Sequence, residues 1–245
     1  MENHTQYCFE RYEKKYIISP DQQKFLLDTI QSHIEEDYYG KYSICNVYYD
    51  TDNWQLVRSS VEKPVYKEKL RVRSYGSALE DSEVFIELKK KFDGIVYKRR
   101  ISTELYSVEP FLCGLIPGSR YGQIGREIEW FQSFYHARPK VFIGYDRIAF
   151  TGTESNDVRI TFDSNIRWRT NRLTLRFDDS DRQLIPNDKL LMELKLPDAC
   201  PIWLCCALSE AGIFPVSFSK YGFCYQSKIL RDSSNLKIGK ELYCA

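Results

Sequence analysis

Residues 67–74 read Lys-Glu-Lys-Leu-Arg-Val-Arg-Ser, with a basic side chain at every second position from Lys67 to Arg73. Side chains of a β-strand alternate between its two faces, so the bases would project from one face and Leu70 and Val72 from the other. For a single strand, the simplest interpretation is a charged face in water and an apolar face on the core. The stretch therefore predicts a strand with one strongly basic face.

The same alternation of charged residues recurs in other extended segments of the chain. The charged positions are Arg11, Glu13 and Lys15, then Lys67, Lys69, Arg71 and Arg73, then Glu87, Lys89, Lys91, Lys98 and Arg100, and finally Arg147, Arg159, Asp163, Glu193 and Lys195. Water-facing strands usually mix signs, because like charges opposite one another are destabilising. If the strands curl, the basic faces could turn inward and leave the apolar faces for helices. Such an arrangement needs an anionic ligand. Phosphate chains supply negative charge, and the planar guanidinium group of Arg can bind two phosphate oxygens at once.

The few acidic residues on these faces have two interpretations. They are Glu13, Glu87, Asp163 and Glu193, and each lies two or four residues from a base on the same face. Each could form an ion pair that orients its basic neighbour, or could bind Mg²⁺ or Mn²⁺, hard ions that bind a carboxylate together with substrate phosphates. We favour Glu193 as the metal ligand, because Leu194 and Leu196 anchor the opposite face of its strand.

The composition excludes several classes of protein. The net charge is only +1, whereas a general nucleic-acid binder is normally basic overall, so nucleic acid is not an expected partner. Three histidines and eight scattered cysteines without a CxxC pair argue against zinc and favour reduced thiols. Residues 1–11 lack the apolar core of a signal peptide, and no apolar run is long enough to span a membrane, so we expect a cytoplasmic protein.

The pattern of apolar and turn residues predicts one large antiparallel sheet, with helices outside it or at its ends. Strands are expected at residues 8–18, 43–49, 65–75, 83–91, 95–102, 140–150, 158–162, 173–177 and 189–196. The clearest helix starts at Ser19, a capping residue, with Pro20 in its first turn, and weaker helices are expected at 51–62, 104–112, 125–136 and 203–211. The apolar residues near one face of the first helix are Phe25, Leu26, Ile30 and Ile34. Asp93-Gly94, between two alternating runs, predicts a hairpin.

Seven short segments, in order along the chain, together resemble one family. They are Phe9-Glu10-Arg11-Tyr12-Glu13-Lys14-Lys15-Tyr16, Leu70-Arg71-Val72-Arg73, Phe85-Ile86-Glu87-Leu88-Lys89, Tyr145-Asp146-Arg147-Ile148-Ala149-Phe150, Val158-Arg159-Ile160-Thr161-Phe162-Asp163, Met192-Glu193-Leu194-Lys195 and Phe218-Ser219-Lys220-Tyr221-Gly222. These segments are similar to motifs of the VTC domain, the polyphosphate-polymerase branch of the triphosphate tunnel metalloenzyme (CYTH-like) superfamily. We expect a single VTC-like domain over residues 1–245, with a core at about 9–226 and a C-terminal tail at 227–245.

The resemblance implies an α+β fold, namely a closed antiparallel eight-stranded β-barrel, or tunnel, with helices packed outside and at the ends. It also implies a metal-dependent polymerase that transfers the γ-phosphoryl group of ATP to orthophosphate or a growing polyphosphate chain and releases ADP. By position, the residues lining the phosphate path would be Lys15, Arg71, Arg73, Lys89, Lys98, Arg147, Arg159 and Lys220. Further substrate contacts would come from Arg11, Lys69, Lys91, Arg100, Lys195 and Tyr145. Glu193 would hold Mn²⁺ or Mg²⁺, and the further candidate ligands are Glu13, Glu87 and Asp163.

Alternatives to a polymerase remain open. Hydrolases of the superfamily typically begin with E-x-E-x-K, whereas the corresponding positions in this chain are Arg11, Glu13 and Lys15. A base in place of an acid favours a polymerase. A tripolyphosphatase or nucleoside triphosphatase on the same tunnel, or a non-catalytic polyphosphate or nucleotide sensor, would keep much of the same basic wall. Family members are often linked to membrane machinery, so a membrane-protein partner, and a location peripheral to a membrane through that partner, is a further expectation.

Overall fold

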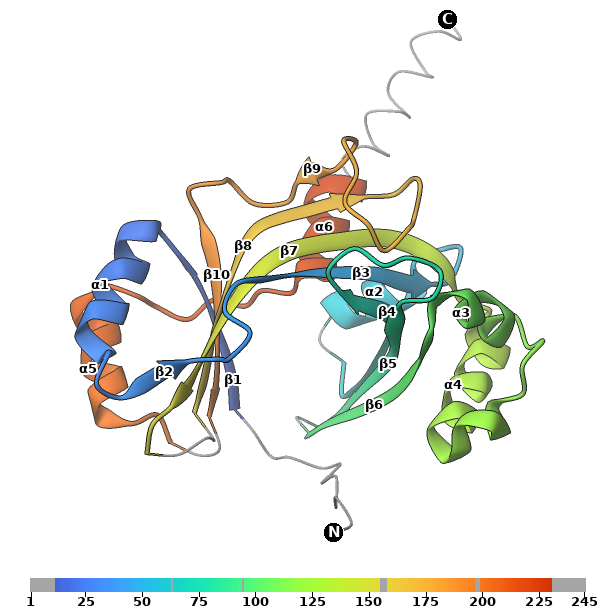
Figure 1. The fold of residues 1–245 in the computed structure, drawn as a ribbon, viewed down its shortest axis with the longest axis horizontal. Helices are drawn as coiled ribbons and strands as arrows, with labels where there is room; N and C mark the ends of the chain where they lie inside the picture. The colour runs from blue at the N-terminus through green and yellow to red at the C-terminus, as the bar shows by residue number, and fades with distance from the viewer. Residues whose placement is uncertain (1–11, 63, 94, 155–157, 197–198, 231–245) are drawn as a thin grey trace, which may run out of the picture.

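The computed structural model describes residues 12–62, 64–93, 95–154, 158–196 and 199–230, and one antiparallel sheet forms its centre (Figure 1). The strands are β1 (Tyr12–Ile18), β2 (Ile34–Glu36), β3 (Tyr42–Asp50), β4 (Tyr66–Tyr75), β5 (Glu83–Phe92), β6 (Ile95–Glu104), β7 (Arg138–Gly152), β8 (Arg159–Arg169), β9 (Arg182–Gln183) and β10 (Leu190–Leu196). The helices are α1 (Pro20–Ile30), α2 (Gln55–Val61), α3 (Leu105–Leu112), α4 (Gly122–Tyr135), α5 (Ile202–Glu210) and α6 (Lys220–Cys224), which continues as a π-helical turn at Tyr225–Ile229. None of the helices in the described part of the chain is long and apolar enough to cross a membrane.

The sheet curls but does not close, so the expectation of a closed eight-stranded barrel is wrong. Its strands follow the order β1-β10-β8-β7-β3-β4-β5-β6, with β2 paired to β7 and β9 to β8, and no ladder joins β1 to β6 within the described residues. The pairing of β7 with β3 and with β8 contains register shifts, and irregularities of this kind increase the local twist. The twist brings Glu13 on β1 within 3.8 Å of Lys89 on β5, so side chains rather than backbone hydrogen bonds join the two sides.

Several expected elements form for the predicted local reasons. Ser19 caps α1, because its hydroxyl accepts from Gln22 N and the Gln22 side chain accepts from Ser19 N. The β5–β6 hairpin also forms, with Asp93 at a positive φ of 43°, while Gly94 lies outside the described residues. Helix α1 ends earlier than expected, so Ile34 begins β2, and Phe25 is 41% exposed instead of lying on the buried face.

Residues 173–177 do not form the expected strand. The guanidinium group of buried Arg169 donates to the carbonyl oxygens of Arg172, Thr174 and Arg176. The segment therefore satisfies backbone acceptors with a side chain instead of a strand ladder. The strand expected at 158–162 is longer and extends as β8 to Arg169, whereas α6, β2 and β9 have no counterpart in the sequence prediction.

Helices lie at both sides of the sheet, α1 and α5 at one side and α3 and α4 at the other (Figure 1). The apolar faces of the strands pack on these helices. On one side, Leu70 and Val72 of β4 belong to the same core as Phe111 of α3 and Phe131 of α4. On the other side, strands β1, β8 and β10 share a core with α1 and α5. The opposite faces of these strands, which carry the alternating charges, line the concave side of the sheet.

Candidate functional site

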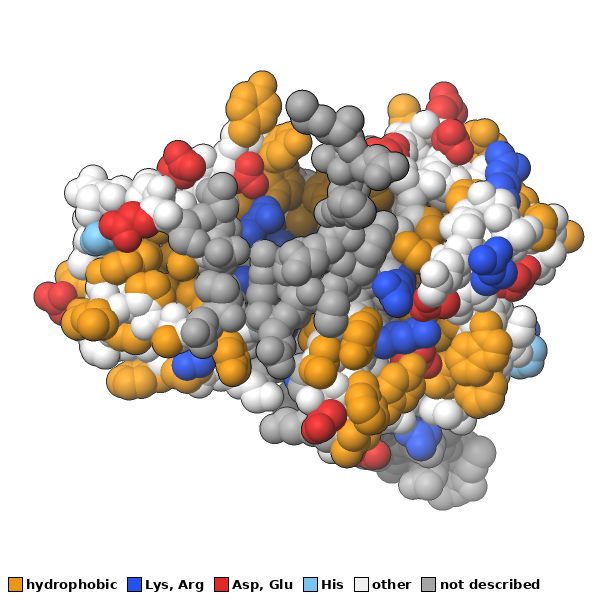
Figure 2. Space-filling view, turned by 90° about the horizontal axis from the view of Figure 1, so that it is seen from below, with side chains coloured by type: hydrophobic (Ala, Val, Ile, Leu, Met, Phe, Trp, Pro, Cys, Tyr) orange, Lys and Arg blue, Asp and Glu red, His pale blue; other side chains and the backbone are white. Residues whose placement is uncertain are grey.

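The concave side of the sheet gathers charged residues from strands that are far apart in the sequence and from α6. Figure 2 shows a few Lys and Arg side chains in the hollow of this face, beside the grey residues that are not described. We call the charged residues of this side the concave cluster; its bases are Lys15, Lys69, Arg71, Arg73, Lys89, Lys98, Arg100, Arg147, Lys195 and Lys220, and its acids are Glu13, Glu87, Asp163 and Glu193. Bases outnumber acids in this cluster, although the whole chain carries a net charge of only +1. A surplus of positive charge in a confined space favours an anionic ligand.

Glu87 on β5 is the central acid in one half of the concave cluster. Its buried carboxylate accepts from Arg71 Nε and from Arg100 Nε, each at 2.8 Å, and Lys98 Nζ lies 3.1 Å away. Burial alone would raise the pKa of Glu87, but Arg71, Arg73, Lys98 and Arg100 hold it well below its usual range. Glu87 therefore stays ionised, and its contacts are those of an ion-pair partner that orients the surrounding bases.

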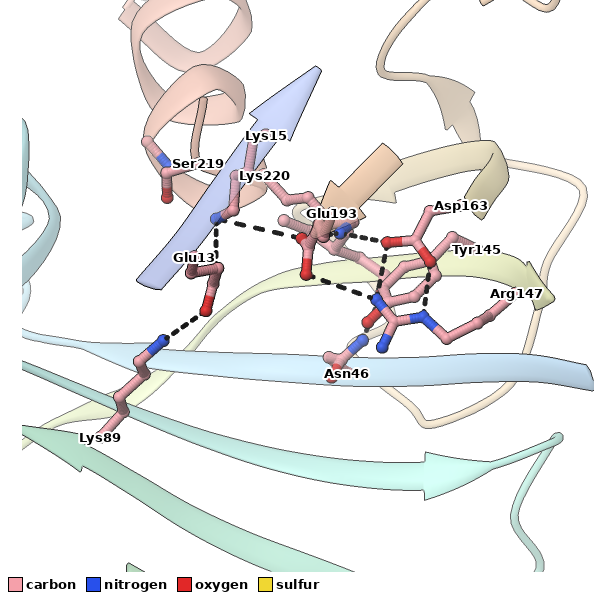
Figure 3. Close-up of polar contacts among 12 residues, drawn as sticks. Glu13, Lys15, Asn46, Lys89, Tyr145, Arg147, Asp163, Glu193, Ser219 and Lys220 are labelled. Carbon is pink, nitrogen blue, oxygen red and sulfur yellow. Dashed lines mark hydrogen bonds and ion pairs between the residues drawn. The ribbon is translucent and has the colours of Figure 1, made fainter. Parts of the chain in front are cut away.

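Glu193 on β10 and Asp163 on β8 are the acids of the other half, and both contact Lys220 at the start of α6 (Figure 3). Lys220 Nζ donates to Glu193 Oε1 at 3.1 Å. Arg147 binds Asp163 through two hydrogen bonds of 2.6 and 2.8 Å, and its Nη2 lies 3.8 Å from Glu193 Oε2. Burial would raise the pKa of Glu193, but Lys220, Lys15 and Arg147 hold it well below its usual range. This half of the cluster is thus a buried network of fixed charges.

Glu13 on β1 connects the two halves of the concave cluster (Figure 3). Its Oε1 lies 3.0 Å from Lys15 Nζ, and its Oε2 lies 3.8 Å from Lys89 Nζ on β5. Burial would raise the pKa of Glu13, but the charges of Lys89 and Lys15 lower it to about 2. The contact brings bases from edge strand β1 and from β5, the strand next to the opposite edge, to one acid.

Two lysines of the concave cluster have unusually low pKa values. Burial, followed by the like charges of Lys89 and Lys15, lowers the pKa of Lys69 to about 7. Burial also lowers the pKa of Lys195 to about 8, against the opposing effect of the nearby acids. Lys69 Nζ donates to Ser219 Oγ at 3.1 Å, which ties β4 to the cap of α6. An anion placed beside these amines would favour their charged forms.

Strand β3 supplies polar groups that the sequence reasoning did not single out. Arg73 Nε donates to Asn46 Oδ1 at 2.9 Å, and Arg71 Nη1 donates to Tyr48 OH at 3.1 Å. Tyr145, which was predicted, accepts from Arg73 Nη2 at 3.3 Å. The signal for Asn46 and Tyr48 was present, since they stand two apart in an expected strand, but neither carries a charge. Ser219 lies in the last of the seven segments, but no role was predicted for it.

Helix α6, which carries Lys220, is held in place by buried Asp50 at the end of β3. The hydroxyl of Tyr221 donates to Asp50 Oδ2 at 2.8 Å. The same carboxylate accepts from two backbone N–H groups in the first turn of α2, each at 2.9 Å. Tyr221 also stacks on Tyr48, with ring centroids 4.7 Å apart. Asp50 therefore fixes the position of α6 relative to the sheet, a role that the sequence reasoning missed.

Some predicted residues lie away from Glu193. Arg159 contacts Asp37 at 3.3 Å with a side chain that is 41% exposed, so it lies toward the rim of the concave face. Lys98 lies beside Glu87 in the other half of the concave cluster, and Lys91 follows Lys89 along the same face of β5. Arg11 lies outside the described residues.

The acids of the concave cluster do not form a metal site by themselves. Among the residues that the structure describes, no group of three or more His, Cys, Asp or Glu side chains is arranged to hold a metal ion. Each of the four acids instead contacts one or more bases. Mg²⁺ and Mn²⁺ take several oxygen ligands, so most of them would have to come from phosphate groups and water.

The chain matches one protein family. The family model described as the VTC domain matches residues 10–229, which include the described members of the concave cluster. A search of curated proteins finds no match.

The fold is similar to that of solved structures with low sequence identity. A candidate adenylate cyclase from Vibrio parahaemolyticus gives a TM-score of 0.50 at 13% identity over 89% of this chain and 98% of that chain. A candidate adenylyl cyclase from Hippeastrum, described as having a dominant triphosphatase activity, gives 0.47 at 16% identity over 88% and 94% of the two chains. A protein from Pyrococcus horikoshii gives 0.42 at 12% identity over 89% and 100%. At 13% identity, the similarity to the Vibrio parahaemolyticus structure is evidence for the fold alone. The two structures with TM-scores below 0.5 support no further conclusion.

Proposed function

This chain belongs to the VTC domain family, and on that basis we propose that it transfers the γ-phosphoryl group of ATP to orthophosphate or a growing polyphosphate chain and releases ADP. The observation that carries the proposal is the surplus of bases over acids on one concave face. Confined like charges repel one another, and a chain of phosphates would supply the missing negative charge. Family membership by itself supports the coarser statement that the substrates are triphosphates or polyphosphates.

The proposed reaction depends on positioned charge. Phosphoryl transfer spreads charge over three equatorial oxygens, and most of its catalysis comes from alignment and electrostatic stabilisation, so no protein nucleophile is needed. Phosphate acceptors are already ionised at neutral pH, so no general base is required either. Lys220 and Arg147 are buried, and both contact Asp163 and Glu193. They come from different elements, α6 and β7, so they could hold the transferred phosphoryl group from two sides.

The remaining bases would hold the phosphate chain on both sides of that point. Those in the Glu87 half are Arg71, Arg73, Lys89, Lys98, Arg100 and Lys91, and those in the Glu193 half are Lys15, Lys195 and Arg159. Arg11, which lies outside the described residues, stays a predicted substrate contact. Lys69 and Tyr145 lie between these sets through their contacts with Ser219 and Arg73. A phosphate chain passing through this space would replace carboxylate contacts with phosphate contacts. Glu87 and Asp163 then serve to orient bases.

A divalent ion, Mn²⁺ or Mg²⁺, would enter this site together with the triphosphate. The protein offers separate carboxylates that are already paired with bases, so the phosphate oxygens must provide most of the ligands. Glu193 is the carboxylate proposed to complete the set, and Glu13, which shares Lys15 with it, is a further candidate donor. The ion would neutralise part of the triphosphate charge.

The direct test is product analysis. The purified chain is incubated with ATP and Mn²⁺, and the products are separated on a urea gel stained for polyphosphate. A ladder of chains with ADP supports the proposal. Orthophosphate without a ladder would indicate a triphosphatase, and ATP that binds without turnover would indicate a sensor.

Two further points belong to the proposal. We propose that residues 1–245 form a single domain, and that a membrane-protein partner receives the polymer. Co-purification of full-length protein from detergent extracts, with and without cross-linking, would test the partner.

A further inference from the structure

A row of aromatic side chains begins where the basic face of β4 ends. We define the aromatic row as Tyr38, Tyr39, Tyr42, Tyr75 and Phe85. On β4 the concave face carries Lys69, Arg71 and Arg73 and then Tyr75, so the next inward position after the bases is a ring. On β5 the ring of Phe85 precedes Glu87 on the same face. The row is therefore continuous with one end of the concave cluster.

The rings touch one another in sequence through edge contacts. The centroid separations are 5.7 Å for Tyr38–Tyr39, 6.3 Å for Tyr39–Tyr42, 6.0 Å for Tyr42–Tyr75 and 5.6 Å for Tyr75–Phe85. None of these contacts is a face-to-face stack. Tyr38 is 96% exposed, Tyr39 73% and Tyr75 49%. The row thus presents ring surface to solvent that a flat ligand could cover.

Arg100 links the aromatic row to the fixed charges. Its guanidinium group lies 4.3 Å from the centroid of Phe85, donates to Tyr75 OH at 3.1 Å and also binds Glu87. At the far side of Tyr75, the ring of Tyr42 stands opposite Arg147 in the pairing of β3 with β7. Both halves of the concave cluster therefore reach the row.

From this juxtaposition we infer that the aromatic row binds the base of the nucleoside triphosphate while the concave cluster holds its phosphates. A nucleoside triphosphate carries a flat ring at one end and a polyanion at the other. The aromatic row and the Lys and Arg side chains of the concave cluster follow one another in the same order. Nucleobases of every kind stack on aromatic side chains, because each has a flat π face. An arginine beside the ring adds a cation–π contribution. At the other end of β4 the concave face carries Lys67 and Lys69 instead of rings, which suits a ligand made of phosphates alone. This inference rests on the proposed function, because it places the nucleotide in the same site.

The test compares two ligands that share phosphates and differ in the base. Calorimetry measures the Kd of ATP and of inorganic tripolyphosphate for the full chain, for Tyr39→Ala and for Tyr75→Leu. We expect each substitution to raise the Kd of ATP about tenfold and to change the Kd of tripolyphosphate by less than about twofold. Tyr39→Phe should bind ATP like the natural chain. The matched control is Tyr106→Ala. Tyr106 is also an exposed tyrosine but lies on α3, outside the aromatic row, so its replacement should change neither Kd.

The outcomes separate this inference from the proposed function. If both Kd values rise together, or neither changes, the aromatic row does not bind the nucleobase. The polymerase proposal is then still decided by the product gel alone. If the natural chain binds neither ligand, both ideas are wrong. If ATP binding depends on Tyr39 but no polyphosphate forms, the base site stands and the polymerase is overturned. Tyr39 is exposed enough that Tyr39→Ala decides the question even if Tyr75→Leu does not fold.

Discussion

Lys220 Nζ lies 3.1 Å from Glu193 Oε1, although Lys220 begins a helix near the end of the described chain and Glu193 lies in the middle of β10 (Figure 3). Lys220 also contacts Asp163, and its ammonium group lies 4.5 Å from the centroid of the Tyr145 ring. The acids raise the pKa of Lys220 well above its usual range in spite of burial. Lys220 is therefore a permanent charge held on three sides, which is the arrangement expected of a group that stabilises a transferred phosphoryl group.

Replacing Lys220 should abolish activity. Lys220→Met removes a fixed charge at the proposed transfer point, so we expect the rate of ATP turnover to fall about 100-fold or more. The substitution also leaves Glu193 with fewer partners, so the free energy of unfolding should fall by up to about 3 kcal/mol. Urea unfolding and ADP release measure the two effects. Lys220→Arg, which keeps the charge, should restore most of the stability; equal turnover in Lys220→Met and the natural chain would refute the assignment.

Removing the acid at the centre of the other half should make stability depend on anions. Glu87→Gln leaves Arg71, Arg100 and Lys98 without their shared carboxylate, so we expect a loss of about 3 kcal/mol. Added tripolyphosphate should raise the Tm of Glu87→Gln by more than it raises the Tm of the natural chain, because phosphate replaces the missing charge. Thermal unfolding with and without the anion measures this. The same increase in both proteins would show that the anion binds elsewhere.

The bond from Tyr221 to Asp50 should matter for both stability and positioning. Tyr221→Phe keeps the ring on Tyr48 and removes one hydrogen bond to a buried carboxylate, which should cost about 1–3 kcal/mol. Because α6 carries Lys220, turnover should fall as well. Tyr225→Phe, in the next turn of the same segment, is the control and should change stability less. Urea unfolding and ADP release check both proteins, and no difference between them would argue against a role for Asp50.

Binding of a polyanion should take up protons at mildly alkaline pH. Burial lowers the pKa of Lys69 to about 7 and that of Lys195 to about 8, both below the usual value of 10.5. A bound phosphate chain favours the ammonium forms and raises both pKa values, so a fraction of each amine that is neutral at pH 8 would gain a proton. Tripolyphosphate affinity should accordingly fall as the pH rises from 6 to 9. The measured binding enthalpy at pH 8 should vary with the ionisation enthalpy of the buffer, and Lys69→Met should reduce that variation.

Much of the concave cluster could be predicted from the sequence, because the side chains of a strand alternate without exception for Lys69, Arg71, Arg73 and for Glu87 and Lys89. Whether the sheet closes could not be predicted, since closure depends on twist summed over many strand pairs, including the register shift between Gly144 and Asp146. The local pattern is the same for an open and a closed sheet.

The site residues outside the alternating charges were harder to find. Asp50 acts through backbone groups of α2 and through Tyr221, and its sequence neighbours give no sign of either contact. Tyr38 and Tyr39 lie in a loop, where no periodicity assigns a face. These positions depend on how separate segments meet, and only the three-dimensional structure shows that.

The most direct measurement follows the phosphorus atoms of ATP. The natural chain is incubated with Mn²⁺ and ATP labelled either at the γ- or at the α-phosphate, and the products are separated on a urea gel. The account predicts that γ label appears in a ladder of phosphate chains, while α label remains in ADP. It is contradicted if γ label appears only in orthophosphate, or if γ label leaves as pyrophosphate while α label enters a cyclic nucleotide.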